Sequence, residues 1–221
     1  MSLYIVSTPI GNLKDITIRA VETLEKADLV LAEDTRRTLT LLNHYKIKVK
    51  LQSYNDINKV RVTPTIINIL KKNMIVALVS DSGTPTISDP GFYLIREAIR
   101  NDIKPIPVPG PSASITALTI AGLPTDKFNF IGFAPKKVTP KMQLFKEIKE
   151  SKTTSIIYES PHRISKTLRA MADIMPDAKV VIARELTKKF EQCIRGTAKE
   201  LDEKYRETPI KGEITLIVKN E

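Results

Sequence analysis

Cysteine and histidine are scarce in this chain of 221 residues, which contains one cysteine, Cys193, and two histidines, His44 and His162. A single cysteine excludes a disulfide framework and a zinc site built on cysteines, and two histidines do not supply a histidine-rich metal site. We therefore expect no metal. Cys193 lies in a strand-like run, so we expect it to pack rather than to react. His44 falls late in a helical segment, where we expect it at the surface or capping the C-terminus of the helix.

Long apolar runs are also lacking, and the N-terminus does not look like a leader segment. No apolar stretch approaches ~18 residues, the length at which a helix can cross a bilayer. The N-terminus enters a strand-like pattern at Leu3 with no basic segment or cleavage site before it. These features predict a soluble, cytoplasmic protein without membrane contact.

Three common catalytic or nucleotide-binding signatures do not occur. No G-x-G-x-x-G follows an apolar run, and neither G-x-x-x-x-G-K-[ST] nor G-x-S-x-G is found. The usual dinucleotide-binding and P-loop sites are thereby excluded, as is the nucleophile turn of serine hydrolases.

The charge that is present is mainly positive. The formal net charge is +10, and 42% of the residues are hydrophobic, which is enough for a normal globular core. A basic balance favours a polyanionic partner such as nucleic acid. The stretch 136–152 holds six lysines and two glutamates, and it suits either an RNA-contacting surface or a solvated helix face.

Strand-like runs alternate with segments of helical period along the whole chain, which predicts an α/β fold. In the first half, strands are expected at 3–7, 29–32, 49–52, 75–79 and 104–108, and helices at 17–27, 35–46, 57–72 and 90–101. In the second half, strands are expected at 128–133, 153–158, 180–184, 191–195 and 213–218, and helices at 139–150, 161–175 and 197–206. The first set predicts a mostly parallel sheet and the second a mixed sheet.

A proline-rich junction separates the two series. Four of the seven residues at 105–111 are proline, which excludes a central strand there and suits a stiff connection. The chain is therefore expected to form two α/β domains, 1–110 and 111–221.

Polar residues, glycine and proline gather just after the expected strands. Ligands of open α/β sheets bind beyond the carboxyl ends of the strands, so these segments are candidate site loops. They are Ser7–Leu13, Glu33–Arg37, Ser80–Gly91, Pro109–Ala113, Tyr158–Arg163 and Arg184–Lys188. Turns and helix caps use the same residue types, which leaves a purely structural role open for any single loop.

Two details favour a functional role. Arg36, Arg37, His162 and Arg163 fall in the first turns of expected helices, where cations oppose the helix dipole, so they are candidate anion contacts. The small residues of the segment 81–85 allow backbone N–H groups to approach a ligand closely.

Together these loops resemble the ribosomal RNA small subunit methyltransferase I family, which belongs to the tetrapyrrole methylase superfamily (class III methyltransferases). The match runs in order from Leu3 to about Val218. The resemblance implies two α/β domains with S-adenosylmethionine (AdoMet) in the cleft between them, in a homodimer. It also implies methylation of the 2′-hydroxyl of a cytidine in the decoding region of 16S rRNA, within the small ribosomal subunit.

The resemblance also implies site residues. The AdoMet contacts would be Pro9, Ser82, Gly83, Thr84, Ile87, Ser112, Ala113, Tyr158, Glu159 and Leu186. The RNA contacts would be Arg36, Arg37, His162 and Arg163. Methyl transfer from a sulfonium needs no metal, because positive charge is neutralised as the methyl group moves, and the enzyme mainly aligns the reactants.

A ribose hydroxyl is a poor nucleophile, so a general base would help. The acids at the expected strand ends are Glu33, Asp34, Glu159 and Glu185. We favour Asp34 as the base, with Arg36 and Arg184 placing a phosphate, and Glu185 remains a catalytic candidate.

Two other functions stay open. A methylase of a small precorrin-type tetrapyrrole would share the cofactor site, and a non-catalytic AdoMet- or RNA-binding protein would share the loops. Members of the family usually carry a further small C-terminal domain, whereas the 221 residues end just after the last expected strand.

Overall fold

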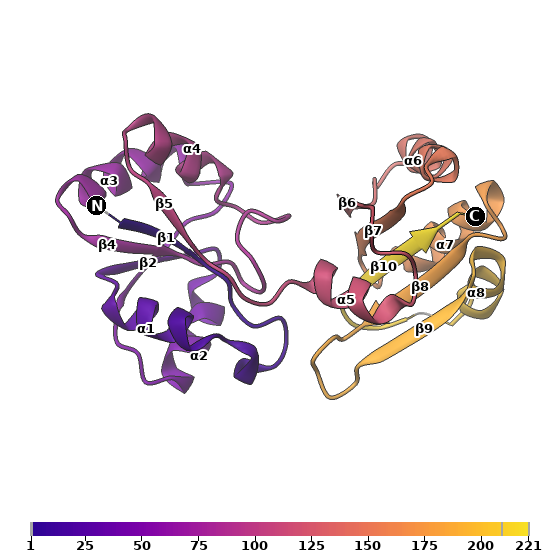
Figure 1. Ribbon diagram of the computed structural model, residues 1–221, viewed down its shortest axis with the longest axis horizontal. Helices are drawn as coiled ribbons and strands as arrows, with labels where there is room; N and C mark the ends of the chain where they lie inside the picture. The colour runs from indigo at the N-terminus through magenta and orange to yellow at the C-terminus, as the bar shows by residue number, and fades with distance from the viewer. Residues whose placement is uncertain (1, 209, 221) are drawn as a thin grey trace. The chain divides into compact units, whose positions relative to one another are not determined.

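The computed structural model describes residues 2–208 and 210–220, which fall into two compact units. Residues up to Ser112 form the first unit, and residues from Ala113 onward form the second. Each unit contains one sheet of five strands with helices packed on both faces (Figure 1). The α/β fold class expected from the sequence is confirmed.

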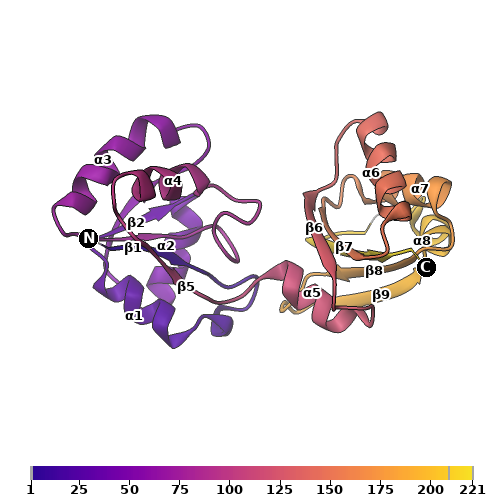
Figure 2. The ribbon, with the colours of Figure 1, turned by 45° about the horizontal axis from the view of Figure 1, so that its top comes forward.

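The first unit is a parallel sheet in the strand order β3-β2-β4-β1-β5. Helices α1 and α2 cover one face and helices α3 and α4 cover the other (Figure 2). Its elements are β1 (Ser2–Val6), the 3-10 helix η1 (Leu13–Asp15), α1 (Ile18–Lys26), β2 (Leu29–Ala32), α2 (Thr35–His44), β3 (Lys50–Ser53), α3 (Lys59–Lys71), β4 (Ile75–Leu78), α4 (Phe92–Arg100) and β5 (Pro105–Val108).

Because both faces of this sheet are buried, its central strands are apolar on both sides. Leu31 and Leu78 belong to the core cluster that includes Leu94 of α4. Val30 and Ala77 belong to the opposite cluster. Strand β5 lies at the sheet edge, where proline, which cannot donate a backbone hydrogen bond, is tolerated.

The second unit has a mixed sheet in the order β6-β7-β10-β8-β9, in which the β6–β7 pair is parallel and the other pairs are antiparallel. Its elements are α5 (Ala113–Ala121), β6 (Phe128–Phe133), α6 (Val138–Glu150), β7 (Thr154–Glu159), α7 (Ile164–Ile174), β8 (Lys179–Arg184), β9 (Gln192–Thr197), α8 (Ala198–Tyr205) and β10 (Ile214–Lys219).

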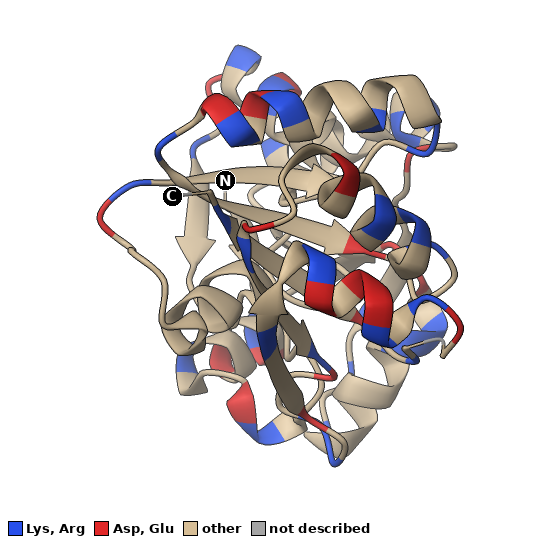
Figure 3. Cartoon of the chain, turned by 90° about the vertical axis from the view of Figure 1, so that its right-hand side faces the viewer, with Lys and Arg blue, Asp and Glu red and all other residues tan. Residues whose placement is uncertain are grey.

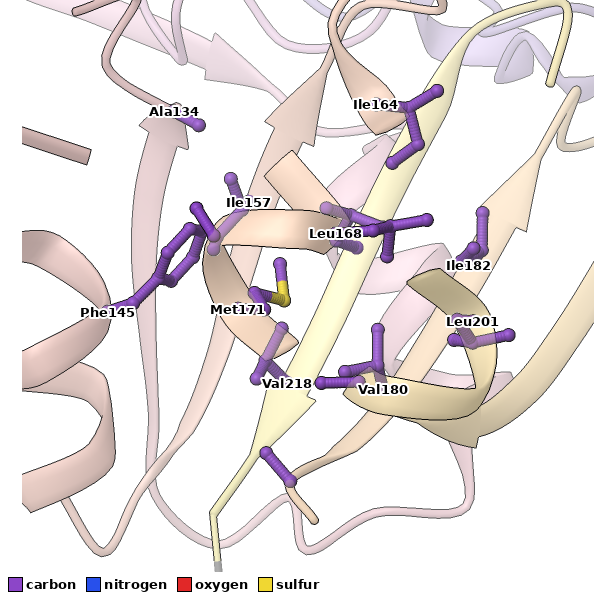
Figure 4. Close-up of a cluster of buried hydrophobic side chains, with 14 of the residues drawn as sticks. Ala134, Phe145, Ile157, Ile164, Leu168, Met171, Val180, Ile182, Leu201 and Val218 are labelled. Atoms are coloured by element: carbon purple, nitrogen blue, oxygen red, sulfur yellow. The ribbon is translucent and has the colours of Figure 1, made fainter. Parts of the chain in front are cut away.

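Alternate residues of the strands point to the two faces of this sheet. On one face, Phe145 of α6, Met171 of α7 and Leu201 of α8 pack with Ile157 and Ile182 (Figure 4). Helix α5 contacts β7, β8 and β10 from the other side of the sheet (Figure 1).

Two expectations need correction. Helix α5 was not expected from the sequence, because its small and apolar residues surround the whole helix and leave no 3.6-residue period to detect. Helix α7 begins at Ile164 and not at 161, so His162 and Arg163 precede the helix. The argument from cations in a first helical turn therefore applies only to Arg36 and Arg37.

Among the described residues, no helix is both long enough and apolar enough to cross a membrane.

Candidate active site

In the first unit, the loops after β1 and β4 are joined by backbone hydrogen bonds. Thr8 N–H donates to the carbonyl of Gly83 at 2.8 Å, and Gly83 N–H donates to the carbonyl of Thr8 at 3.0 Å. The hydroxyl of Thr8 also donates to the carbonyl of Ser80 at 3.3 Å. Gly83 has φ +78°, a conformation that suits glycine. The two loops thus form one continuous edge at the carboxyl ends of neighbouring strands.

The loop that follows β5 joins the same edge. The Thr84 hydroxyl donates to the carbonyl of Pro111 at 3.1 Å and lies 3.0 Å from the hydroxyl of Ser7. Gly110 lies so close to Ser7 that a Cβ at position 110 would be 2.9 Å from Ser7 Cβ. Only glycine fits this approach without a shift, so three loops converge with small, hydroxyl-bearing residues facing one another.

The loop after β2 carries Asp34, which caps helix α2. Its carboxylate accepts the backbone N–H of Arg36 at 2.9 Å and forms an ion pair with the Arg36 guanidinium at 2.6 Å. Hydrogen bonds from Arg36 hold the pKa of Asp34 at about 2. The backbone N–H of Asp34 donates to Asp81 Oδ1 at 2.9 Å, which ties this loop to the loop after β4. A carboxylate with so low a pKa stays ionised but accepts a proton poorly.

Asp89 is a residue of this edge that was absent from the expected site. It follows β4, and its pKa is raised to about 7, chiefly by burial and then by the negative charge of Glu33. The pKa of Glu33 is also raised, by burial and by Asp81. The sequence signal was available in the segment 80–91, but alternation and spacing do not show which acid of such a segment is buried.

In the second unit, the carboxylate of Glu159 at the end of β7 is fully enclosed. Oε1 accepts the backbone N–H of Ser160 at 2.7 Å and pairs with Arg163 Nη2 at 2.6 Å. Oε2 accepts the hydroxyl of Thr167 at 2.5 Å. Arg163 in turn donates to the carbonyl of Ala134 at 3.1 Å. Both Glu159 and Arg163 are therefore engaged within the unit.

Lys141 lies behind this cluster and is 5% exposed. Its ammonium donates to the hydroxyl of Thr167 at 2.8 Å, and burial lowers its pKa. Lys141 was expected among the exposed lysines of 136–152. The structure places it on the buried stripe of α6 with Phe145 and Ile148.

The loop after β8 holds Arg184 and Glu185 in contacts within the same unit. Arg184 donates to the carbonyl of Lys211 at 2.9 Å and to the side chain of Gln192 at 2.8 Å. Glu185 accepts the backbone N–H of Glu213 at 2.9 Å and the ammonium of Lys188 at 3.1 Å. The bond from Glu213 lowers the pKa of Glu185.

The structure thus distributes the residues expected at the cofactor over the two units. Those at the loop edge of the first sheet are Pro9, Ser82, Gly83, Thr84, Ile87 and Ser112; those in the second unit are Ala113, Tyr158, Glu159 and Leu186. Of the four expected RNA contacts, Arg36, Arg37 and His162 are exposed, whereas Arg163 is partly covered.

Within the part of the chain that the structure describes, no three or more His, Cys, Asp or Glu side chains are grouped as metal ligands.

Comparison with known proteins places these loops in a defined family. Residues 2–202 match a family model described as tetrapyrrole (corrin/porphyrin) methylases. The ribosomal RNA small subunit methyltransferase I of Halalkalibacterium halodurans is 49% identical over 98% of this chain and 75% of that protein. The protein of the same name from Hydrogenobaculum is 49% identical over 100% of this chain and 96% of its own length. That of Thermotoga maritima is 45% identical over 98% of this chain and 97% of its own length.

Solved structures share the fold at low sequence identity. A diphthine synthase matches with a TM-score of 0.79 and 16% identity, over 100% of this chain and 90% of that chain. A cobalt precorrin-4 methyltransferase matches with a TM-score of 0.68 and 21% identity, over 99% of this chain and 94% of that chain. At these identities the comparison shows the fold alone.

Proposed function

The chain belongs to the ribosomal RNA small subunit methyltransferase I family of tetrapyrrole methylases, and on this premise we propose that it methylates the ribose 2′-hydroxyl of a cytidine in 16S rRNA with AdoMet as donor. The single observation that carries the proposal is the identity of 43–49% to relatives of that name along nearly the whole chain. By the family resemblance, the protein acts as a homodimer in the cytoplasm on the small ribosomal subunit.

The residues at the loop edge of the first sheet fit AdoMet. Gly83 and Gly110 leave out side chains where the loops converge, and Ser7 and Thr84 supply hydroxyls. Such an edge, with small residues and a few oriented polar groups, is typical of a cofactor site. When bound, AdoMet supplies a methyl group carried on a sulfonium sulfur. From the family resemblance, we propose Tyr158 and Leu186 of the second unit as further AdoMet contacts.

The backbone N–H of Gly83 already donates to the carbonyl of Thr8 and is not free to donate to the ligand. We propose that this glycine serves the site by allowing the loop its conformation, with φ +78°. Glu159 likewise acts through its neighbours, because its carboxylate is enclosed. We propose that Glu159 fixes the direction of Tyr158 and of the turn that carries His162.

The proton of the 2′-hydroxyl needs an acceptor, and two carboxylates of the first unit are candidates. Asp34 lies beside the exposed Arg36, which suits a position near an RNA phosphate. Asp89 has a pKa of about 7, which matches proton transfer near neutral pH better than the pKa of about 2 at Asp34. We propose that one of these two residues is the base. Glu185 is tied to Glu213 and Lys188, which favours a structural role.

RNA binding would use cations on several elements. Arg36 and Arg37 are exposed at the start of α2, with 89% and 65% of their side chains accessible. Lys136, Lys137 and Lys146 are exposed on and before α6. In Figure 3, basic positions are spread over helices and loops and are interspersed with acidic ones. Contacts to phosphate of this kind position an RNA without reading its sequence.

A methylase of a small tetrapyrrole is the second candidate, because the family description and one structural neighbour name such substrates. Tight binding of a precorrin-type compound would favour it. The net charge of +10 and the exposed arginines of α2 support RNA instead.

The experiment that tests the proposal is transfer of a labelled methyl group from AdoMet to small ribosomal subunits that lack the native modification, followed by digestion to nucleosides. Label in 2′-O-methylcytidine is the expected result. Label in another nucleoside would show that the protein methylates a different acceptor and would overturn the assignment of cytidine. Normal AdoMet binding without any transfer to rRNA would overturn the proposal of an rRNA substrate. Absence of AdoMet binding would overturn the proposed cofactor as well.

A further inference from the structure

A small pocket opens beside the cofactor edge of the first unit, between the loop after β1 and the first turns of α2. Its volume is about 90 Å³, and its lining includes Thr8, Pro9, Leu13, Arg37, Thr38 and Asp81. A cavity of about 150 Å³ holds one benzene ring, so this smaller pocket suits the edge of one ring or a polar group rather than a whole nucleotide.

The hydroxyl of Thr38 is the unusual feature of this lining. Thr38 is 4% exposed, and its Oγ1 is buried without a hydrogen-bond partner among the described residues. The hydroxyls of Thr8 and Ser80 beside it are both hydrogen-bonded. A buried hydroxyl without a partner destabilises the fold, and native proteins rarely keep one without a reason. A ligand that enters the pocket and displaces the atoms covering this oxygen would supply the missing partner.

Charge in the pocket favours an uncharged ligand. The positive end of α2 is already offset by Asp34, which caps the helix, and by Asp81, which accepts the Asp34 N–H at 2.9 Å. Asp81 Oδ2 lies 3.5 Å from Arg37 Nε, beyond the usual range of a hydrogen bond between nitrogen and oxygen. A phosphate placed here would meet the carboxylate of Asp81, with Arg37 as the one cation among the described residues of the lining. A neutral group with both donors and acceptors would meet a carboxylate and a hydroxyl.

Cytosine presents such a set on one edge. Its exocyclic amino group donates, and a carboxylate is its typical partner in proteins, while ring N3 and O2 accept. Uracil has a carbonyl in place of the amino group, which a carboxylate repels. The apolar wall of Pro9 and Leu13 suits the face of a ring.

We propose that this pocket reads the base of the acceptor nucleotide as cytosine, with Asp81 accepting from the amino group and Thr38 donating to the ring edge. The inference rests on the proposed function and adds to it the residues that select the acceptor. Arg37, at the mouth, would hold the adjoining backbone.

The first test compares methylation of small subunits that carry cytidine or uridine at the acceptor position. The wild type prefers cytidine, and Asp81→Asn reduces that preference about tenfold or more, because an amide can donate to the uracil carbonyl. Thr38→Val raises KM for the cytidine substrate about threefold to tenfold and leaves AdoMet affinity unchanged. Thr38→Ser, which keeps the hydroxyl, is the matched control.

Thermal unfolding separates this role from a structural one. Thr38→Val removes an unpartnered buried hydroxyl, so we expect its Tm to rise by a few degrees while activity on the cytidine substrate falls. The proposal would be overturned if the Tm of Thr38→Val rises while its KM stays unchanged and Asp81→Asn keeps the base preference of the wild type.

A second measurement does not depend on methyl transfer. Millimolar cytidine should raise the Tm of the wild type more than uridine does, and Asp81→Asn should abolish the difference. If the wild type methylates no rRNA yet shows this difference, the pocket assignment stands and the proposed function falls. Equal shifts by both nucleosides would overturn the pocket assignment.

Discussion

The ammonium of Lys141 and the carboxylate of Glu159 are linked through one buried hydroxyl, that of Thr167. The hydroxyl accepts from Lys141 at 2.8 Å and donates to Glu159 at 2.5 Å. Arg163 pairs with the other oxygen of the same carboxylate at 2.6 Å. Glu159 is almost wholly removed from solvent and thus has one cation in direct contact and a second linked through a hydroxyl.

Removal of Lys141 leaves Glu159 paired with Arg163 alone and takes the charged donor from the buried Thr167 hydroxyl. We expect Lys141→Met to lower the free energy of unfolding by about 1–3 kcal/mol, because the buried hydroxyl of Thr167 loses its charged donor. Lys146→Met, at an exposed position of the same helix, is the control and should change it by less than about 0.5 kcal/mol. Urea unfolding measures both. Equal midpoints for the two variants would show that the cluster contributes little to stability.

The convergence of Ser7 and Gly110 gives a second test. Gly110→Ala places a methyl group 2.9 Å from Ser7 Cβ, so the loops must separate. We expect a loss of about 1–3 kcal/mol in stability and weaker binding of AdoMet in calorimetry. Ser7→Gly combined with Gly110→Ala removes the clash and should recover part of both losses. If the double variant is no better than Gly110→Ala, contact with Ser7 is not the cause.

The sequence predicts much of this fold because its apolar residues recur at the spacing of strands and helices. All ten strands of the described residues were expected within two residues of each end, and β5 was expected not to be central because of its prolines. Helix α5 could not be found in this way, since small and apolar residues are distributed all around it and leave no period to detect. The strand-end loops were located by the same logic, because parallel strands end at one edge of a sheet.

The sequence does not predict which polar side chains are buried. Lys141 looked like one more lysine of a basic helix, although its spacing of four and seven residues from Phe145 and Ile148 places all three on one face. Asp89 and Asp34 both follow strands, yet Asp89 is half-buried near Glu33 and Asp34 is paired with Arg36. Such differences depend on contacts between distant segments, which no local pattern records.

Asp89 should make stability depend on pH. Its pKa of about 7 lies above the value of 3.8 for the unfolded chain. Between about pH 4 and 7 the folded state therefore holds a proton that the unfolded state has lost, and stability falls as the pH rises through this range. Asp89→Asn mimics the protonated form and removes this decline. We expect the variant to match the wild type at pH 4 and to be about 1–2 kcal/mol more stable at pH 8, with allowance for partial exposure. Parallel pH–stability curves for the two proteins would contradict the assignment.

The identity of the base is tested by the pH dependence of kcat/KM for methyl transfer. If Asp89 accepts the proton, the rate rises with pH and levels off above about pH 7, and Asp89→Asn lowers it by about 100-fold or more without that rise. If Asp34 accepts the proton, no rise appears between pH 5 and 9, because its pKa is about 2, and Asp34→Asn gives the loss instead. Arg36→Lys serves as the comparison, since it weakens the partner of Asp34 and leaves Asp89 untouched. Full turnover by Asp34→Asn with normal RNA binding would remove Asp34 from the reaction, and full turnover by Asp89→Asn would remove Asp89.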